Sequence, residues 1–373
     1  MLRNFFRNYV YPIATLTGGI IGVGFLSLPY ITLKVGIFAM LFYFIILTSL
    51  VLFLHLIFGQ ICLKTPDFKR WPGFVGFYLG TTAKKIILVS MIFGSFGVLL
   101  AYLLIGGQFF WAIFSPFFGG DVLNYILIYF ILASIFIYFG VKMISRFDFF
   151  ALMFLFLVLF LIFFKGFSQV NLSDFFTNTL GDWKTFFLPY GAIIFSLWGT
   201  GFIPEVEEMI RGNKGSLKKI IAISILLASV FYLLFIFLIL GISGSQTTDS
   251  ALSGLKNFLG QEIYLVALSI GVITTFLAFI AQGLLLKKVF MYDMGVKEFP
   301  AWCLTCFSPL ALFLLGFNSF IPLISFVGGV FLGIDGVLIL LIYQKIGGNK
   351  TIAYPLMLVF MLGIIYSIVY FVK

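Results

Sequence analysis

The sequence consists of long apolar runs separated by short segments that contain charged residues, glycine or proline. A helix needs about 20 mostly apolar residues to cross a bilayer, with a range of about 17–25 and more when it is tilted. Dividing the chain at its polar segments predicts eleven membrane spans, all helical, because a lipid-exposed backbone must satisfy its own hydrogen bonds. They cover residues 9–33, 36–63, 84–114, 121–142, 147–167, 186–210, 217–241, 260–291, 299–316, 319–345 and 351–371.

Composition supports this pattern and excludes several classes of protein. Of the 373 residues, 62% are hydrophobic and 10% are charged, whereas soluble proteins are about 45–50% apolar and about 25% charged. A soluble enzyme, a nucleic-acid-binding protein and a disordered chain are therefore excluded. We expect one transmembrane domain over residues 1–373. We expect no enzymatic activity, because the sequence contains neither a nucleophile–base constellation nor a phosphate-binding loop.

The net charge of +10 reflects membrane orientation rather than a nucleic-acid partner. With the N-terminus in the cytoplasm, the spans place most of the 23 Lys and Arg residues on the cytoplasmic side. The exceptions are Lys34, Lys165, Lys184, Lys256 and Lys373. This asymmetry follows the positive-inside rule. It predicts an extracytoplasmic C-terminus in a plasma or inner cell membrane, with the lipid bilayer as the surrounding partner.

One outer loop contains a predicted short helix. Residues 243–259 include TTDSALSGLKNFLG, in which Asp249 is placed to cap a helix with Leu252, Leu255, Phe258 and Leu259 on one side. The segment is interpreted either as a lid over an outer vestibule or as an amphipathic loop at the membrane interface.

Two spans are interrupted in the same way. The first reads TGGIIGVGF followed by Pro29, and the sixth reads FSLWGTGF followed by Pro204. Glycine costs about 1 kcal/mol relative to alanine inside a helix, so several in one turn favour an unwound backbone. The two motifs lie in the first and sixth spans, which are five apart, so they cross the membrane in opposite directions. Paired interruptions of this kind indicate a transporter built from inverted repeats, although glycines that allow close helix packing are the alternative.

These two motifs resemble a known family. TGGIIGVGFLSLPY and PYGAIIFSLWGTGFIPEVEEMIRG are similar to the first and sixth helices of the amino acid–polyamine–organocation transporter superfamily. The closest resemblance is to the aromatic amino acid and amino acid/auxin permeases. It implies a LeuT-type fold with five-helix inverted repeats over residues 9–167 and 186–345, discontinuous helices 1 and 6, and an additional helix at 351–371.

The resemblance also implies a substrate site at the two interruptions. It places the carboxylate of an amino acid at the amides of Gly22, Val23 and Gly24, where a helix N-terminus favours negative charge. The ammonium group would meet carbonyl groups near Ile20, Phe195 and Ser196. Trp198 matches an aromatic residue beside the substrate, although packing alone would also explain it.

A candidate cation site lies in the eighth span. Gly271, Thr274 and Thr275 share one helix face and offer a carbonyl and two hydroxyl groups. In sodium-coupled members of this fold, a matching Ser/Thr pair joins carbonyl groups of the first helix, here Gly18 and Ile21. Na⁺ is therefore favoured slightly as the coupling ion, while hydroxyl bonds within the helix are the ordinary alternative.

Protons are the alternative coupling ion, because a few ionisable residues lie within the spans. Such residues are costly at membrane depth and are functional candidates. Asp335 is the deepest, His55 is expected to be neutral and hydrogen-bonded, and Glu205 closes the sixth-helix interruption, with Arg211 in reach for a gate ion pair.

The sequence thus predicts a secondary active transporter that moves amino acids with an ion by alternating access. A nucleobase or another small organic solute is the alternative substrate. A membrane sensor that has kept a permease-like site without transporting its ligand is the alternative function.

Overall fold

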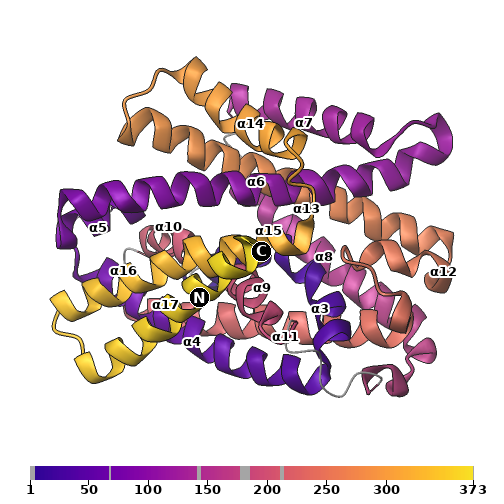
Figure 1. The fold of residues 1–373 in the computed structure, drawn as a ribbon, viewed down its shortest axis with the longest axis horizontal. Coiled ribbons are helices and arrows are strands. Elements are labelled where there is room, and N and C mark those ends of the chain that lie inside the picture. Colours follow the sequence, from indigo (N-terminus) through magenta and orange to yellow (C-terminus); the bar gives the residue numbers. More distant parts are fainter. Residues whose placement is uncertain (1–4, 67–68, 141–143, 177–184, 211–213, 373) are drawn as a thin grey trace.

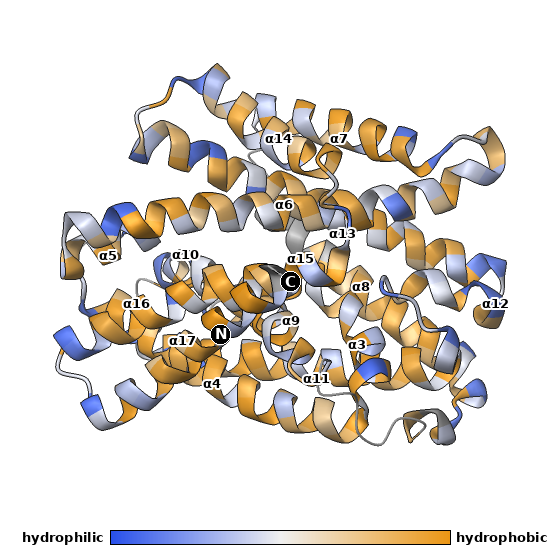
Figure 2. Ribbon diagram, in the orientation of Figure 1, coloured by the Kyte–Doolittle hydropathy of each residue, from blue (hydrophilic) through white to orange (hydrophobic). Residues whose placement is uncertain are grey.

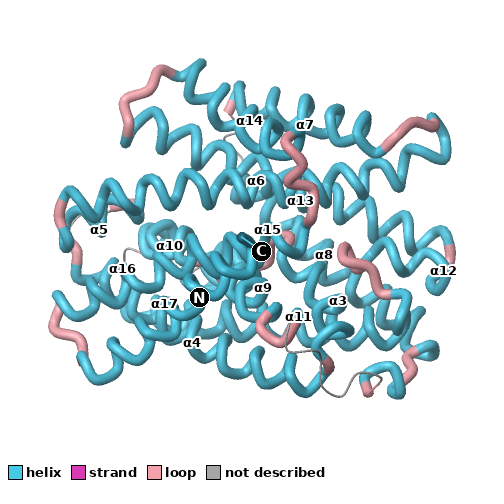
Figure 3. The backbone as a smooth tube through the Cα atoms, viewed as in Figure 1, coloured by secondary structure: helices cyan, strands magenta, loops and turns pink. Residues whose placement is uncertain are grey.

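The structure is a computed structural model that describes residues 5–66, 69–140, 144–176, 185–210 and 214–372. Its long helices lie side by side in one bundle (Figure 1), and the described residues contain no strand (Figure 3). The helices are η1 Phe6–Val10, α2 Tyr11–Ile20, η2 Gly24–Ser27, α3 Leu28–Val35, α4 Ile37–Lys64, α5 Trp71–Leu79, α6 Thr81–Phe118, α7 Val122–Phe139, α8 Ile144–Gly166, η3 Phe167–Gln169, η4 Leu172–Phe175, α9 Leu188–Leu197, η5 Thr200–Phe202, α10 Ile203–Met209, η6 Lys214–Ser216, α11 Leu217–Ser243, η7 Gly244–Gln246, η8 Leu252–Leu255, α12 Lys256–Leu259, α13 Gln261–Lys288, η9 Val289–Asp293, α14 Glu298–Leu314, α15 Phe320–Phe326, η10 Val327–Phe331, α16 Leu332–Lys345 and α17 Lys350–Val372.

Every predicted span contains a helix or an interrupted helix. Within the described residues, eight helices are long and apolar enough to cross a membrane. A ninth span is the pair Phe6–Ile20 and Gly24–Val35, which bends by 50° at its break. The other two predicted spans correspond to the 17-residue α14 and to α9 with α10, which are short because the sixth span is interrupted. The chain is an all-helical, multi-pass membrane protein.

The segment before the third span differs from the prediction. We expected a loop up to residue 84, but α5 occupies Trp71–Leu79 and α6 begins at Thr81. Pro72 lies in the first turn of α5, where its missing N–H is tolerated, and Gly80, at φ 89°, ends the helix. Nine residues are too few to cross a bilayer, so a search for spans overlooks this helix. Its side chains Trp71 and Phe74 are buried against the rest of the bundle.

The predicted short helix of residues 243–259 is present, but its predicted cap is wrong. Of the four residues expected on one side, Leu252, Leu255 and Leu259 are buried and Phe258 is half-buried, in η8 and α12. The residue at the N-cap position is Ala251, and no side chain caps the helix. Ala251 has φ 57°, and after the turn at this residue the helix starts at Leu252, three residues after Asp249. The Asp249 carboxylate therefore lies outside the capping position.

Buried apolar side chains form two clusters. The larger includes side chains of α2, α3, α4, α9 and α11 together with some from α6 and α13, and the smaller joins α6, α7, α13 and α14. The four helices of the smaller cluster lie in the upper half of Figure 1. The buried side chains of the interrupted helices belong to the larger cluster alone, whereas α6 and α13 contribute to both clusters.

The outer surface of the bundle is apolar along most of its length, and hydrophilic residues gather at the two ends of the long helices (Figure 2). On α4, Phe38, Phe42 and Ile45 are each more than half exposed, while Phe44 and Leu47 on the other face are buried. An apolar stripe that faces outward is stable only against lipid, which is the expected surroundings of this fold.

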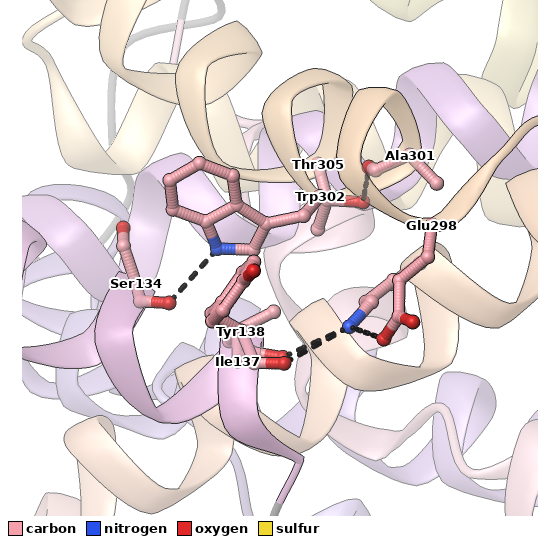
Figure 4. Close-up of polar contacts among 8 residues, drawn as sticks. Ser134, Ile137, Tyr138, Glu298, Ala301, Trp302 and Thr305 are labelled. Carbon is pink, nitrogen blue, oxygen red and sulfur yellow. Dashed lines mark hydrogen bonds and ion pairs between the residues drawn. The ribbon is translucent and has the colours of Figure 1, made fainter.

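One buried cation fixes the end of α7 (Figure 4). Lys287 Nζ donates hydrogen bonds to the carbonyl groups of Ile137 and Tyr138, at 3.4 and 3.2 Å, and pairs with Glu298 Oε1 at 2.8 Å. The last carbonyl groups of a helix lack partners within the helix and carry partial negative charge. Lys287 is 6% exposed and Glu298 is 63% exposed, so the lysine is the buried partner of this pair.

We expect Lys287→Met to lower the stability of the protein by about 2 kcal/mol, because the α7 carbonyl groups lose their charged donor. Glu298→Gln should cost less than about 1 kcal/mol, because its carboxylate is mostly exposed. Thermal unfolding in detergent, followed by tryptophan fluorescence, measures both changes. Equal losses for the two variants would contradict a dominant role for helix capping.

Candidate functional site

The first interruption is a tight turn followed by amides without partners. The Ile21 backbone, at φ −76° and ψ 78°, leaves the helix, and the Gly22 N–H donates to the Ile20 carbonyl group at 2.8 Å. This is the geometry of an inverse γ-turn. The chain resumes as a 3₁₀ helix at Gly24. Among the described residues, no hydrogen-bond acceptor is found for the amides of Val23 and Gly24.

The sixth interruption is closed by a histidine. Helix α9 ends at Leu197, Trp198 is extended at ψ 122°, and helical structure resumes at Thr200. The Gly199 N–H donates to His55 Nε2 at 2.9 Å, while His55 Nδ1 bonds to the Val51 carbonyl group at 2.8 Å. Because Nε2 accepts a hydrogen bond here, His55 is a neutral imidazole with its hydrogen on Nδ1. The predicted neutral, hydrogen-bonded His55 fits this geometry.

The two interruptions pack directly against each other. A Cβ atom on Gly24 would lie 2.6 Å from Ser196 Oγ and 3.1 Å from the Ser196 Cα, and one on Gly199 would overlap Ile20. The contacts pair later residues of the first span with earlier residues of the sixth, so the two segments cross in opposite directions. Glycine is required at these positions because the space for a side chain is occupied by the other interruption.

Tyr232 of α11 bridges both interruptions, and the sequence analysis missed it. Its hydroxyl group is 2.7 Å from the Ser196 carbonyl oxygen and 3.1 Å from the Ile20 carbonyl oxygen, and the residue is fully buried. The hydroxyl group has one hydrogen, so the two carbonyl groups share it. A tyrosine within the apolar run ASVFYLLF was the available sequence signal.

A small cavity of about 40 Å³ lies beside the first interruption. Gly22 and Val23 line it, and Tyr102 of α6 enters the lining with its hydroxyl group 2.7 Å from the position of a Cβ on Gly22. The other lining residues are almost all apolar: Ile21, Phe25, Leu26, Leu155, Val158, Leu159, Ile162, Phe231, Phe235, Leu252, Ala267, Ile270, Gly271, Thr274, Thr275 and Ala278. Gly24, Phe195 and Ser196 lie at the crossing instead, and Trp198 lies beside His55.

Some of the predicted cation ligands line the same cavity. Ile21, Thr274 and Thr275 line it. The Thr275 hydroxyl group donates to the Gly271 carbonyl group at 2.8 Å, and the Thr274 hydroxyl group donates to Ile270 at 2.9 Å. A hydroxyl group that donates in this way can still bind a hard cation through its oxygen. The Tyr129 hydroxyl group also interacts with Thr275, without the geometry of a hydrogen bond. The Gly271 carbonyl group, however, already accepts hydrogen bonds from both threonine hydroxyl groups, and Gly18 does not line the cavity. Thr274, Thr275 and Ile21 are therefore better placed to bind a cation than Gly271 and Gly18 are.

Asp335 has a partner that the sequence did not predict. Trp71 Nε1 of α5 donates to Asp335 Oδ1 at 3.0 Å. The indole N–H of Trp198 also interacts with this carboxyl group, without the geometry of a hydrogen bond. The rings of Trp198 and His55 meet edge to face at 5.5 Å. Asp335, His55 and the sixth-helix interruption therefore form one connected group.

Glu205 lies outside this group. It is exposed in the first turn of α10, and the cations that act on it are Arg70 and Lys288. The predicted partner Arg211 lies outside the described residues, so the gate ion pair stays a prediction.

The sequence matches the model of a family described as "Transmembrane amino acid transporter protein" over residues 9–343. The chain belongs to this family. A search of curated proteins finds no significant match. Membership in the family agrees with the resemblance to the amino acid–polyamine–organocation superfamily that the two glycine motifs carry.

Solved structures show the same fold. The crystal structure of MhsT in complex with L-phenylalanine matches with a TM-score of 0.62 and 14% identity, over 97% of this chain and 98% of that one. The structure of Mhp1, a nucleobase-cation-symport-1 family transporter in a closed conformation with bromovinylhydantoin bound, matches with a TM-score of 0.65 and 13% identity, over 89% of this chain and 77% of that one. This transporter family member therefore has the predicted LeuT-type fold.

We expect Tyr232→Phe to lower stability by about 1–3 kcal/mol, because two buried carbonyl groups lose their shared donor while the ring is kept. Thermal unfolding in detergent measures the loss. Tyr354→Phe on α17, where the tyrosine is 55% exposed, is the matched control and should change little. The same small change in both variants would show that the bridge adds nothing to stability.

Proposed function

We propose that this protein is a secondary active transporter of amino acids, driven by an ion gradient and working by alternating access. The observation that carries the proposal is the crossing of two interrupted helices beside a cavity. There the amides of Val23 and Gly24 lack acceptors within the described residues. Free amides at the start of a half-helix bind a carboxylate well.

The cavity lining favours an amino acid with an apolar side chain. Beside the amides, the Tyr102 hydroxyl group offers a polar contact near Gly22, and the remaining walls are mostly aliphatic and aromatic. A volume of 40 Å³ holds about three water molecules. An amino acid therefore requires the lining helices to separate, as alternating access demands.

The ammonium group has a defined place in this proposal. The carbonyl groups of Ile20 and Ser196 share the single hydrogen of Tyr232, and Ile20 also accepts the Gly22 amide. A substrate ammonium group would donate to Ser196 and Phe195 when the Tyr232 hydroxyl group turns to Ile20. Trp198 remains the aromatic wall of the sixth interruption.

In this proposal the unit that contains α2, α3, α9 and α10 would rock against the group of α6, α7, α13 and α14. The side chains that α6 and α13 contribute to the larger cluster would form the contact that changes. The division into repeats over residues 9–167 and 186–345, followed by a helix at 351–371, is part of this proposal. So are a cytoplasmic N-terminus, an extracytoplasmic C-terminus and a location in a cell membrane.

Uptake of a labelled mixture of the twenty amino acids into proteoliposomes tests the function. We expect uptake that needs an ion gradient and that apolar amino acids inhibit best. Uptake of a nucleobase with no amino acid uptake would change the substrate class. Ligand-induced thermal stabilisation without uptake or exchange would favour the sensor function instead.

Gly24→Ala tests the site with a minimal change. A Cβ atom 3.1 Å from the Ser196 Cα forces the two interruptions apart, and overpacking of this kind costs about 1–3 kcal/mol, so uptake should fall about tenfold or more. Gly201→Ala is the matched control, because nothing lies within 4 Å of its Cβ position. Normal membrane insertion of both variants, with uptake lost only in Gly24→Ala, is the expected result. Equal uptake by the two variants would show that the substrate does not bind at the crossing.

The coupling ion is proposed to be Na⁺, held by the hydroxyl groups of Thr274 and Thr275 with the Ile21 carbonyl group. Thr275→Ala should then raise the Na⁺ concentration needed for half-maximal uptake about tenfold or more, while Thr275→Ser retains the ligand. If protons are the coupling ion, Thr275→Ala leaves ion dependence unchanged. Asp335→Asn, which still accepts from Trp71, then alters the pH profile of uptake. Uptake measured at varied Na⁺ and pH separates the two ions.

A further inference from the structure

An open pocket of about 600 Å³ lies away from the candidate substrate site. It is formed by the segment that leads into α5, by α5 itself, by the start of α6 and by η9. Among the described residues, Lys69, Arg70 and Lys84 line it together with one carboxylate, that of Asp293. The lining therefore carries a clear excess of positive charge, and its volume falls within the ordinary range of ligand pockets.

The cations are held in place by the glycine face of α5. A Cβ atom on Gly73 would meet the Lys69 side chain at 3.2 Å, and one on Gly76 would meet the Lys84 side chain at 3.1 Å. These two glycines are three residues apart and so lie on the same face of the helix. The stems of both lysines therefore lie against α5, and Lys69 Nζ is 5.4 Å from the centre of the Phe77 ring. Packing against α5 therefore restricts the positions that the two lysine side chains can take in the pocket.

We propose that this pocket binds the phosphate-containing headgroup of an anionic phospholipid. Two lysines and an arginine that converge on one cavity suit a phosphate group, which accepts several charge-assisted hydrogen bonds. Basic pockets at the ends of transmembrane helices bind such headgroups.

A lipid fits the pocket better than a soluble anion does. Phe77 is 54% exposed and Tyr292 is 73% exposed, and both belong to the lining. Aromatic side chains at the end of a membrane bundle favour the boundary between headgroups and acyl chains. In Figure 1, α5 lies at the end of the bundle where α16 and α17 are connected, and hydrophilic residues gather at this end in Figure 2.

Helix α5 connects this pocket to the candidate coupling residues. Arg70 lines the pocket, and the next residue, Trp71, donates to Asp335. Arg70 is also one of the two cations that act on Glu205. A headgroup bound to Arg70 therefore competes with Glu205 for this cation and contacts the helix that holds the Asp335 partner.

Binding of phosphatidylglycerol to the purified full-length protein, measured by native mass spectrometry, tests the proposal. Each cation at a membrane surface contributes about 1 kcal/mol, so Arg70→Gln and Lys84→Gln should each weaken binding about fivefold. Lys85→Gln is the matched control, because this neighbouring lysine is exposed and does not line the pocket, and it should bind as the wild type does. Gly76→Leu keeps every charge but fills the pocket, and it should lose binding by at least as much.

Two results would overturn the proposal. Equal losses for Lys84→Gln and Lys85→Gln, with full binding by Gly76→Leu, would show a diffuse surface attraction. Displacement of phosphatidylglycerol by equimolar inorganic phosphate or glycerol 3-phosphate would assign the pocket to a soluble anion. Phosphatidylcholine should not bind, and unchanged thermal unfolding of each variant shows that it folds normally. These measurements use no transport assay, so they stand independently of the proposed function.

Discussion

The constraint on which the rest of this structure depends is that an interrupted helix inside a membrane must find partners for the backbone groups it releases. An unsatisfied amide or carbonyl group in hydrocarbon costs several kcal/mol. Here the partners come from three sources. Gly22 bonds to Ile20 within the turn, His55 accepts from Gly199, and Tyr232 donates to Ile20 and Ser196. The fold tolerates two interruptions because neighbouring helices serve them.

The unequal distribution of these partners gives the site its chemistry. The released carbonyl groups of Ile20 and Ser196 already share a donor, whereas the amides of Val23 and Gly24 have no acceptor in the described part of the chain. The side that remains open is therefore the positive one, at the start of a helical segment. In the proposed function, this positive end takes the carboxylate of the amino acid, and the ammonium group of the same molecule lies near the carbonyl groups.

How much of this could be predicted depends on whether a feature is local. The eleven helical segments and both interruptions follow from apolar runs and glycine clusters, which are local properties of the sequence. Tyr232 and Trp71 were missed because their roles depend on which helix lies opposite them, and Tyr232 is separated from Ile20 by 212 residues. Helix α5 was missed because its apolar run of nine residues is too short to cross a bilayer. The cap at Asp249 failed because the turn at Ala251 moved the start of the helix.

Helix α5 also connects the crossing of the two interrupted helices with the basic pocket at the end of the bundle. Trp71 is buried against Phe58, with ring centres 5.2 Å apart, and donates to Asp335, so α5 is anchored to α4 and α16 together. Any change in the separation of α4 and α16 must therefore move α5 or break the bond to Asp335. The sixth interruption is bonded to α4 through His55, so in the proposed alternating-access cycle opening of the crossing would also displace α5. The pocket proposed for a lipid headgroup lies on this helix, so a bound headgroup would stabilise one arrangement of the transporter over another.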